Sequence, residues 1–168
     1  GDPCFTGNEI EVCWGKEGTL GDFTPALEIS IVYLTTPGDY STARIARVAV
    51  DPKDDRTTSN SFSSPSGGAA CEIDSQKFAF RKRFNFNPLG VITDNLQLAR
   101  IRFLYNTDMG HPVAVQVFGS DTLPAQGVVI SSTGISGSSN RKVEVIRGYK
   151  ELPLNLTGGV FAEEGIQE

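Results

Sequence analysis

Several residue types and patterns are scarce or absent in this sequence of 168 residues. No stretch approaches the roughly 18 consecutive apolar residues of a membrane-spanning helix. There is one histidine, His111, and the three cysteines Cys4, Cys13 and Cys71 have no CxxC spacing, so the common zinc-site patterns are excluded. GxSxG, HExxH and Walker-type motifs are also absent. We therefore expect no catalytic centre, no metal and no cofactor.

Composition and charge exclude further classes. The net charge of -5 and the pI near 4.9 do not provide the basic field with which nucleic-acid binders capture phosphates. We therefore expect no strong nucleic-acid binding. The hydrophobic fraction of 39% and the charged fraction of 21% are typical of an ordinary globular protein and not of a disordered chain. The length fits a single domain, which we expect to span residues 1–168.

Apolar residues recur with a period of two along most of the chain, which is the pattern of half-buried strands. In residues 9–14, for example, Ile10, Val12 and Trp14 share one face. Gly, Pro and Asn separate the segments of this kind, which cover residues 9–14, 27–33, 44–50, 78–84, 98–105, 113–117, 127–132 and 142–146. In residues 44–50 the alternation is less clean and does not determine which face points inward. The pattern predicts an all-β fold, an antiparallel β-sandwich of about eight or nine short strands with little helix.

Two segments depart from the alternation. Residues 51–72 are rich in Asp, Ser, Thr, Gly and Pro, which indicates a long surface loop or a two-stranded excursion. Residues 158–168 begin with glycine and end in acidic residues, and we expect a flexible tail there. Residues 51–55 cluster three carboxylates of the kind that calcium prefers, but they lack the DxDxDG spacing. We interpret them as an Asp-Pro turn with solvated charges.

The cysteines favour one disulfide and one remaining thiol, as in a secreted protein, over three buried reduced thiols. Cys71 ends a Gly-rich loop, so a bond to Cys4 would tether this loop to the N-terminal segment. We therefore predict the disulfide Cys4–Cys71. The pairings Cys4–Cys13 and Cys13–Cys71 remain open, because spacing alone does not determine connectivity.

Basic residues on two of the expected strands form a candidate binding site. Arg81, Lys82 and Arg83 lie on one strand and Arg100 and Arg102 on another, so neighbouring strands would align them as a stripe for an acidic polymer. The interpretation that we favour is that these residues are the charged outward faces of a half-exposed sheet, where charge also discourages edge aggregation.

Two single residues, Trp14 and His111, are of types that often serve a function, but their positions favour a structural role. Trp14 offers a stacking platform for a sugar, but it shares a face with Ile10 and Val12, and we predict that it packs in the core. His111 lies in the short link between two strands, and we interpret it as a turn residue and not as a general base. On the expected strand 98–105, Ile101, Phe103 and Tyr105 are predicted to face inward.

A succession of short phrases in the second half of the chain carries a resemblance. The phrases are DNLQLARIRFLYN at 94–106, LPAQG at 123–127, ISSTG at 130–134 and RKVEVIRGYKELP at 141–153. In this order they resemble the C-terminal soluble part of pilin-like proteins with prepilin-type N-termini, as found in type IV pilus and pseudopilus systems. Residues 11–14 and 26–33 are similar to the early strands of that domain.

The resemblance implies an extracellular or bacterial cell-surface subunit, structural or adhesive, without catalytic activity. It also implies contacts with other filament subunits through an apolar N-terminal helix, and contact with the membrane only through that helix. That helix and its processing site are missing from this sequence, and residues 158–162 with the acidic tail replace a longer apolar closing strand. The resemblance transfers no catalytic residue.

Two further hypotheses remain beside the pilin-like one. The first is a secreted β-sandwich binding module, which recognises a surface carbohydrate or another polar or acidic polymer through loops at one end. The second is a secreted hydrolase with dispersed carboxylates.

Overall fold

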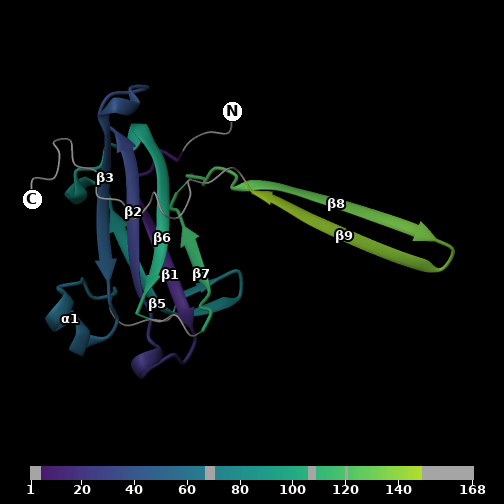
Figure 1. Cartoon of the computed structure of the whole chain (residues 1–168), viewed down its shortest axis with the longest axis horizontal. Coiled ribbons are helices and arrows are strands. Elements are labelled where there is room, and N and C mark those ends of the chain that lie inside the picture. The colour runs from purple at the N-terminus through teal and green to yellow at the C-terminus, as the bar shows by residue number, and fades with distance from the viewer. Residues whose placement is uncertain (1–4, 67–70, 106–108, 120, 149–168) are drawn as a thin grey trace, which may run out of the picture. The chain divides into compact units, whose positions relative to one another are not determined.

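The computed structural model describes residues 5–66, 71–105, 109–119 and 121–148, and Figure 1 shows the helices and strands that they form. The chain divides into two compact units, residues 1–124 and 125–168. Strands predominate among the described residues, so the predicted all-β fold is confirmed.

The described residues form nine strands, one short α-helix and four short 3-10 turns. The strands are β1 Glu9–Lys16, β2 Ala26–Leu34, β3 Ala43–Val50, β4 Cys71–Ile73, β5 Gln76–Asn85, β6 Leu96–Leu104, β7 Val113–Gln116, β8 Gly127–Ser136 and β9 Ser139–Gly148. The helix is α1 Asp54–Asn60, and the 3-10 turns are Gly21–Phe23, Tyr40–Thr42, Asn87–Leu89 and Thr93–Asn95. No helix in the described ranges is long and apolar enough to cross a bilayer.

Two antiparallel sheets form the first unit. One has the strand order β4-β5-β1-β7 and the other β3-β2-β6. The alternating apolar residues of both sheets meet in one core cluster, to which β1 contributes Ile10, Val12 and Trp14 and β2 contributes Leu27 and Ile29. This shared core makes the unit a sandwich, as the period of two predicted.

Trp14 lies in this core and is fully buried, which confirms the prediction that it packs and does not form an exposed platform. Its indole Nε1 donates a hydrogen bond to the carbonyl oxygen of Pro25 at 3.0 Å. The polar atom of the ring is therefore satisfied, and the rest of the indole adds apolar surface to the core.

The connection that follows α1 bridges the edges of the two sheets. Ser63 donates its N–H to Ala49 O at 3.0 Å and accepts from the N–H of Asp51 at 2.9 Å, along the edge of β3. Ser66 donates its N–H to Arg81 O at 2.9 Å, along the edge of β5. The predicted excursion therefore combines a helical turn with a segment that closes one side of the sandwich.

The second unit contains the antiparallel hairpin β8–β9, in which all ten residues of each strand are paired. Gly137 has a φ of 60° in the two-residue turn between the strands, a backbone conformation for which glycine is best suited. The expected tail at residues 158–168 lies outside the described residues.

Candidate functional site

A disulfide joins Cys13 of β1 to Cys71 of β4, with a Cα–Cα distance of 6.0 Å. The predicted pairing of Cys71 with Cys4 is therefore wrong, and one of the pairings left open is the correct one. The physical reason is strand order: β4 pairs with β5, and β5 pairs with β1, which brings Cys71 next to Cys13. Cys4 lies outside the described residues.

The disulfide lies in a small hydrophobic cluster of its own. Cys13, Cys71 and Phe78 are buried there, and Ile73 and Ala114 pack against them. This cluster is separate from the main core, so the disulfide fastens the short strand β4 where the main core does not hold it.

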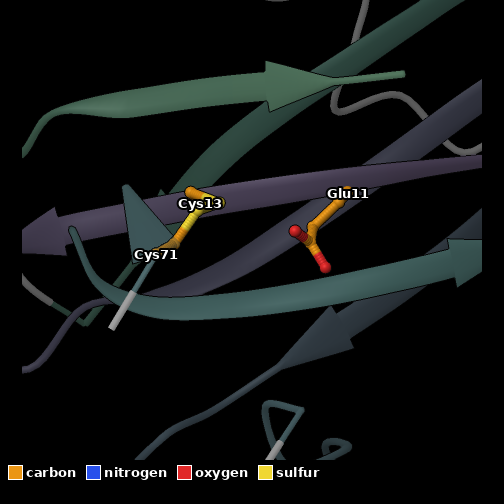
Figure 2. A group of neighbouring side chains, drawn as sticks. All are labelled: Glu11, Cys13 and Cys71. Carbon is orange, nitrogen blue, oxygen red and sulfur yellow. A yellow bond between two sulfur atoms is a disulfide. The ribbon is translucent and has the colours of Figure 1, made fainter. Parts of the chain in front are cut away.

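Glu11 lies beside the disulfide, and Figure 2 shows the three side chains together. One carboxylate oxygen and the two sulfur atoms lie within 4.8 Å of one another, and all three residues are buried. Cysteine binds zinc as a thiolate, and both sulfurs here are already bonded to each other. In the oxidised protein this group is therefore a structural cluster and does not offer a metal site.

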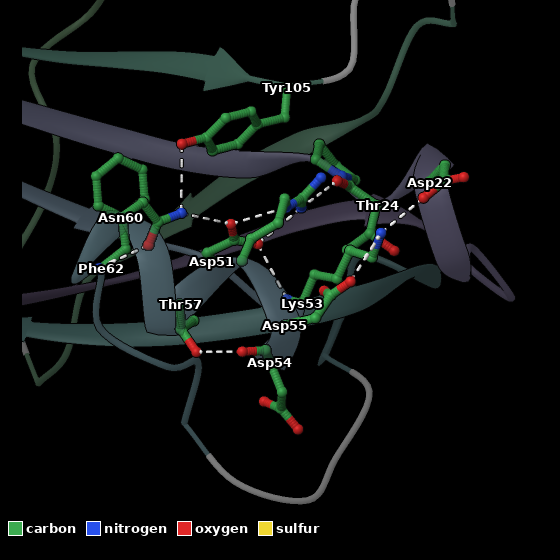
Figure 3. Close-up of polar contacts among 12 residues, drawn as sticks. Asp22, Thr24, Asp51, Lys53, Asp54, Asp55, Thr57, Asn60, Phe62 and Tyr105 are labelled. Atoms are coloured by element: carbon green, nitrogen blue, oxygen red, sulfur yellow. Dashed lines mark hydrogen bonds and ion pairs between the residues drawn. The ribbon is translucent and has the colours of Figure 1, made fainter.

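Figure 3 shows a polar cluster around Asp51. The side chain of Asp51 is 0% exposed. Arg56 donates to both carboxylate oxygens, from Nε to Oδ2 at 2.9 Å and from Nη2 to Oδ1 at 2.7 Å. Asn60 donates from Nδ2 to Oδ2 at 2.9 Å, and the backbone N–H of Lys53 donates to Oδ1 at 3.0 Å. The buried carboxylate thus receives four hydrogen bonds, which offset the loss of water.

The same contacts determine the charge of Asp51. Burial penalises the ionised carboxylate, but the hydrogen bonds from Arg56, from the Lys53 N–H and from Asn60 outweigh this penalty. They hold the pKa of Asp51 below its usual value of 3.8. Asp51 is therefore a negative charge at neutral pH, fixed opposite a guanidinium.

Arg56 connects this cluster to two other parts of the first unit. Its Nη2 also donates to Thr24 O at 2.8 Å, just before β2. Its guanidinium lies over the ring of Tyr105, 4.7 Å from the centroid. Tyr105 is 53% exposed with a φ of 67°, so the prediction that it faces inward is wrong. It covers Arg56 instead.

Lys53 forms the outer part of the cluster. Its Nζ lies 2.6 Å from Asp22 Oδ1 and 3.3 Å from Asp55 Oδ2. The hydrogen bond with Asp22 is the largest cause of the raised pKa of Lys53, and it lowers the pKa of Asp22. The interpretation of residues 51–55 as solvated charges is wrong for Asp51, which is buried. The Asp51 carboxylate pairs with Arg56, and the Asp55 carboxylate pairs with Lys53.

The five basic residues predicted as a stripe are divided between the two sheets. Arg81 and Arg83 lie across from Cys13 and Glu11 in the register of β5 with β1, on the outer face of the sheet β4-β5-β1-β7. Lys82 lies across from Val12, and its Nζ reaches the carbonyl oxygen of Ser64 at 2.7 Å. On the other sheet, Arg100 and Arg102 lie across from Ser30 and Glu28. The structure therefore does not bring the five residues together.

Arg83 is already engaged on its own sheet. Its Nη1 lies 3.5 Å from Glu9 Oε1, and its Nε lies 3.9 Å from Glu11 Oε1. Its guanidinium also lies over the ring of Phe118, 4.0 Å from the centroid. These contacts fit the interpretation that charge on this sheet belongs to an outward structural face.

Arg47 joins Arg100 on the other sheet, and sequence analysis missed it. Ser30 of β2 lies between its two register partners, Arg47 of β3 and Arg100 of β6. Arg102 lies two residues further along β6, on the same face, across from Glu28. We call Arg47, Arg100 and Arg102 the outer basic group. The alternation in residues 44–50 was too irregular to tell which face Arg47 takes, and only the register with β2 determines it.

His111 lies between β6 and β7, in the link where the sequence placed it. Its Nδ1 accepts a hydrogen bond from the Lys16 N–H at 3.3 Å, and its ring packs edge-on against Phe103. Burial lowers the pKa of His111 below 6.5, so the ring is neutral at neutral pH. Its contacts join the link to β1 and to the core.

Comparison with known protein families, with curated proteins and with solved structures finds no match for this chain.

Proposed function

We propose that this chain is a structural or adhesive subunit of an extracellular assembly on a bacterial surface, of the pilin-like kind that its sequence resembles, without catalytic activity. The observation that carries the proposal is the buried disulfide Cys13–Cys71. Disulfides of this kind persist in oxidising compartments outside the cytosol and are rare in reduced ones. A sandwich fastened in this way suits a domain that remains folded at a cell surface.

The polar clusters support the same proposal. Asp51 and Arg56 are held by hydrogen bonds that join β3, α1 and the segment before β2. Arg83 is likewise shared between Glu9 and Glu11. The charged side chains of these groups are engaged with one another and stabilise the sandwich. This use of charge suits a domain that acts as a rigid surface for contacts and not as a catalyst.

The test is the location of the protein on the producing cells. Antibodies against the purified chain should label surface filaments in immunogold electron microscopy of intact cells. Thiol labelling of the same cells, before and after reduction, should show Cys13 and Cys71 oxidised. Label confined to the cytosol, or Cys13 and Cys71 reduced in the cell, contradicts the proposal.

The outer basic group favours a second candidate, a secreted module that binds an acidic polymer. This group places three arginines, Arg47, Arg100 and Arg102, on one face of the sheet β3-β2-β6. Glu28, across from Arg102, is the acidic residue among their register partners on β2. A sulfated glycan would be captured by counterion release, so its affinity should fall steeply with added salt.

This candidate has a matched pair of triple variants. Replacing Arg47, Arg100 and Arg102 by Ala should abolish salt-sensitive retention on a heparin column, whereas replacing Arg81, Lys82 and Arg83 should change it less, because Arg83 is already paired. Equal losses from both variants contradict a site at the outer basic group. In either case we expect no strong binding to duplex DNA at physiological salt, since the net charge of -5 opposes phosphate capture.

A further inference from the structure

The hairpin β8–β9 exposes apolar side chains on both of its faces. In its register, Val128, Ile130, Val143 and Val145 share one face, and Val129 and Ile146 share the other. These six side chains are 52 to 79% exposed. Strands with apolar residues on both faces are typical of sheets covered on both sides. A sheet of only two strands is also marginally stable in water.

Charge is distributed unequally between the two strands. β8 contains no charged residue, whereas β9 contains Arg141, Lys142, Glu144 and Arg147. Charged side chains on an edge strand discourage pairing with another chain, and a long uncharged β-branched edge invites it. The outer edge of β9 is thus protected, and the outer edge of β8 is not.

The other edge strands of the described residues differ from β8. β3 carries Arg44 and Arg47, and β6 carries Arg100 and Arg102. β7 is uncharged but has four residues, against ten in β8, and β4 has three residues, one of them Glu72. The edge that best matches β8 in length and in absence of charge is therefore β8 itself.

We propose that β8 pairs along its outer edge with β8 of a second copy of this chain. The two hairpins then form one four-stranded antiparallel sheet in the order β9-β8-β8-β9, related by a two-fold axis. The outward N–H and C=O groups of each β8 bond to those of the other, and the charges of both β9 strands lie at the outer edges. The pairing uses a surface other than the disulfide-linked sandwich, and it does not depend on the proposed filament.

The experiment is sedimentation velocity of the full chain over a concentration series. The test variant is Ser131→Lys, at the middle of β8 and across from Glu144 in the hairpin, so the hairpin itself gains a favourable pair. The control Asn140→Lys adds the same charge on β9, across from Ile135. The wild type should dimerise, Ser131→Lys should weaken the dimer at least about tenfold, and Asn140→Lys should change it less than about twofold.

Hydrogen exchange completes the test. Amides of β8 should be protected in the dimer and should exchange faster in Ser131→Lys at the same concentration. A wild type that stays monomeric at about 100 μM overturns the proposal. So does a dimer that both variants weaken equally or neither weakens, or one that remains on a denaturing gel without reductant. A monomer with protected β8 amides also overturns it, because its own chain then covers the edge.

Discussion

Asp51 determines the structure of the connection that follows β3. The residues after it show no apolar period, yet α1 forms at Asp54–Asn60. The helix forms because two of its residues, Arg56 and Asn60, bond to the carboxylate of Asp51. A short polar helix of this kind is stabilised by its tertiary contacts more than by its own propensity.

Replacing Asp51 by Asn should destabilise the protein by about 3 to 5 kcal/mol, because the substitution leaves the partly buried Arg56 without its counter-charge. Urea unfolding at neutral pH measures the loss. The matched control is Asp55→Asn, since the Asp55 side chain is 69% exposed and pairs with Lys53 at the surface. This control should change stability by less than about 0.5 kcal/mol. Similar effects of the two substitutions would contradict a special role for Asp51.

The lowered pKa of Asp51 gives a second prediction, in the acid range. A carboxyl whose pKa is lower in the folded than in the unfolded state stabilises the fold above its usual pKa, here 3.8. That stability is lost as the pH falls through the folded-state pKa. The difference in unfolding free energy between wild type and Asp51→Asn should therefore be constant from about pH 7 to pH 5 and narrow at about pH 3. An equally wide gap at both extremes contradicts the assignment.

Among the elements, β4 shows what a single covalent bond contributes. It has three residues, too few for a stable edge strand on its own, and it pairs with β5 alone. The disulfide Cys13–Cys71 spans a sequence separation of 58 residues. Closing a loop of this length restricts the unfolded chain and so stabilises the folded one.

Removing this disulfide by Cys13→Ser with Cys71→Ser should lower the unfolding free energy by about 4 kcal/mol. Denaturant unfolding measures the loss, and wild type in reductant should show a similar one. The denatured, unreduced wild type should contain one free thiol. Cys4→Ser is the control, with no free thiol and unchanged sensitivity to reductant. Sensitivity to reductant that disappears in Cys4→Ser contradicts the pairing.

At the scale of the whole molecule, the division into two units has a consequence for folding. Both sheets of the sandwich, its core cluster and the disulfide lie within residues 1–124. The second unit adds the hairpin β8–β9, which pairs only with itself among the described strands. Global stability should thus come from the first unit.

A chain ending at Pro124 should therefore unfold cooperatively, with a free energy within about 1 kcal/mol of that of the full chain. Circular dichroism with urea compares the two, at a concentration where both are monomeric. The complementary truncation, residues 125–168 alone, should show no cooperative transition, since an isolated hairpin is marginally stable. A large loss of stability on removing residues 125–168 contradicts the independence of the first unit.

The sequence by itself determined the β class, the approximate strand positions and the burial of Trp14, because the period of two is a local property of the chain. It did not reveal α1, β4 or the outward turn of Tyr105, since each depends on contacts between distant residues. The face that Arg47 takes depends on its register with β2, and the partner of Cys71 depends on the order β4-β5-β1. Only the tertiary structure decided these features, because strand order and register result from packing across the sandwich, which alternation along one strand does not encode.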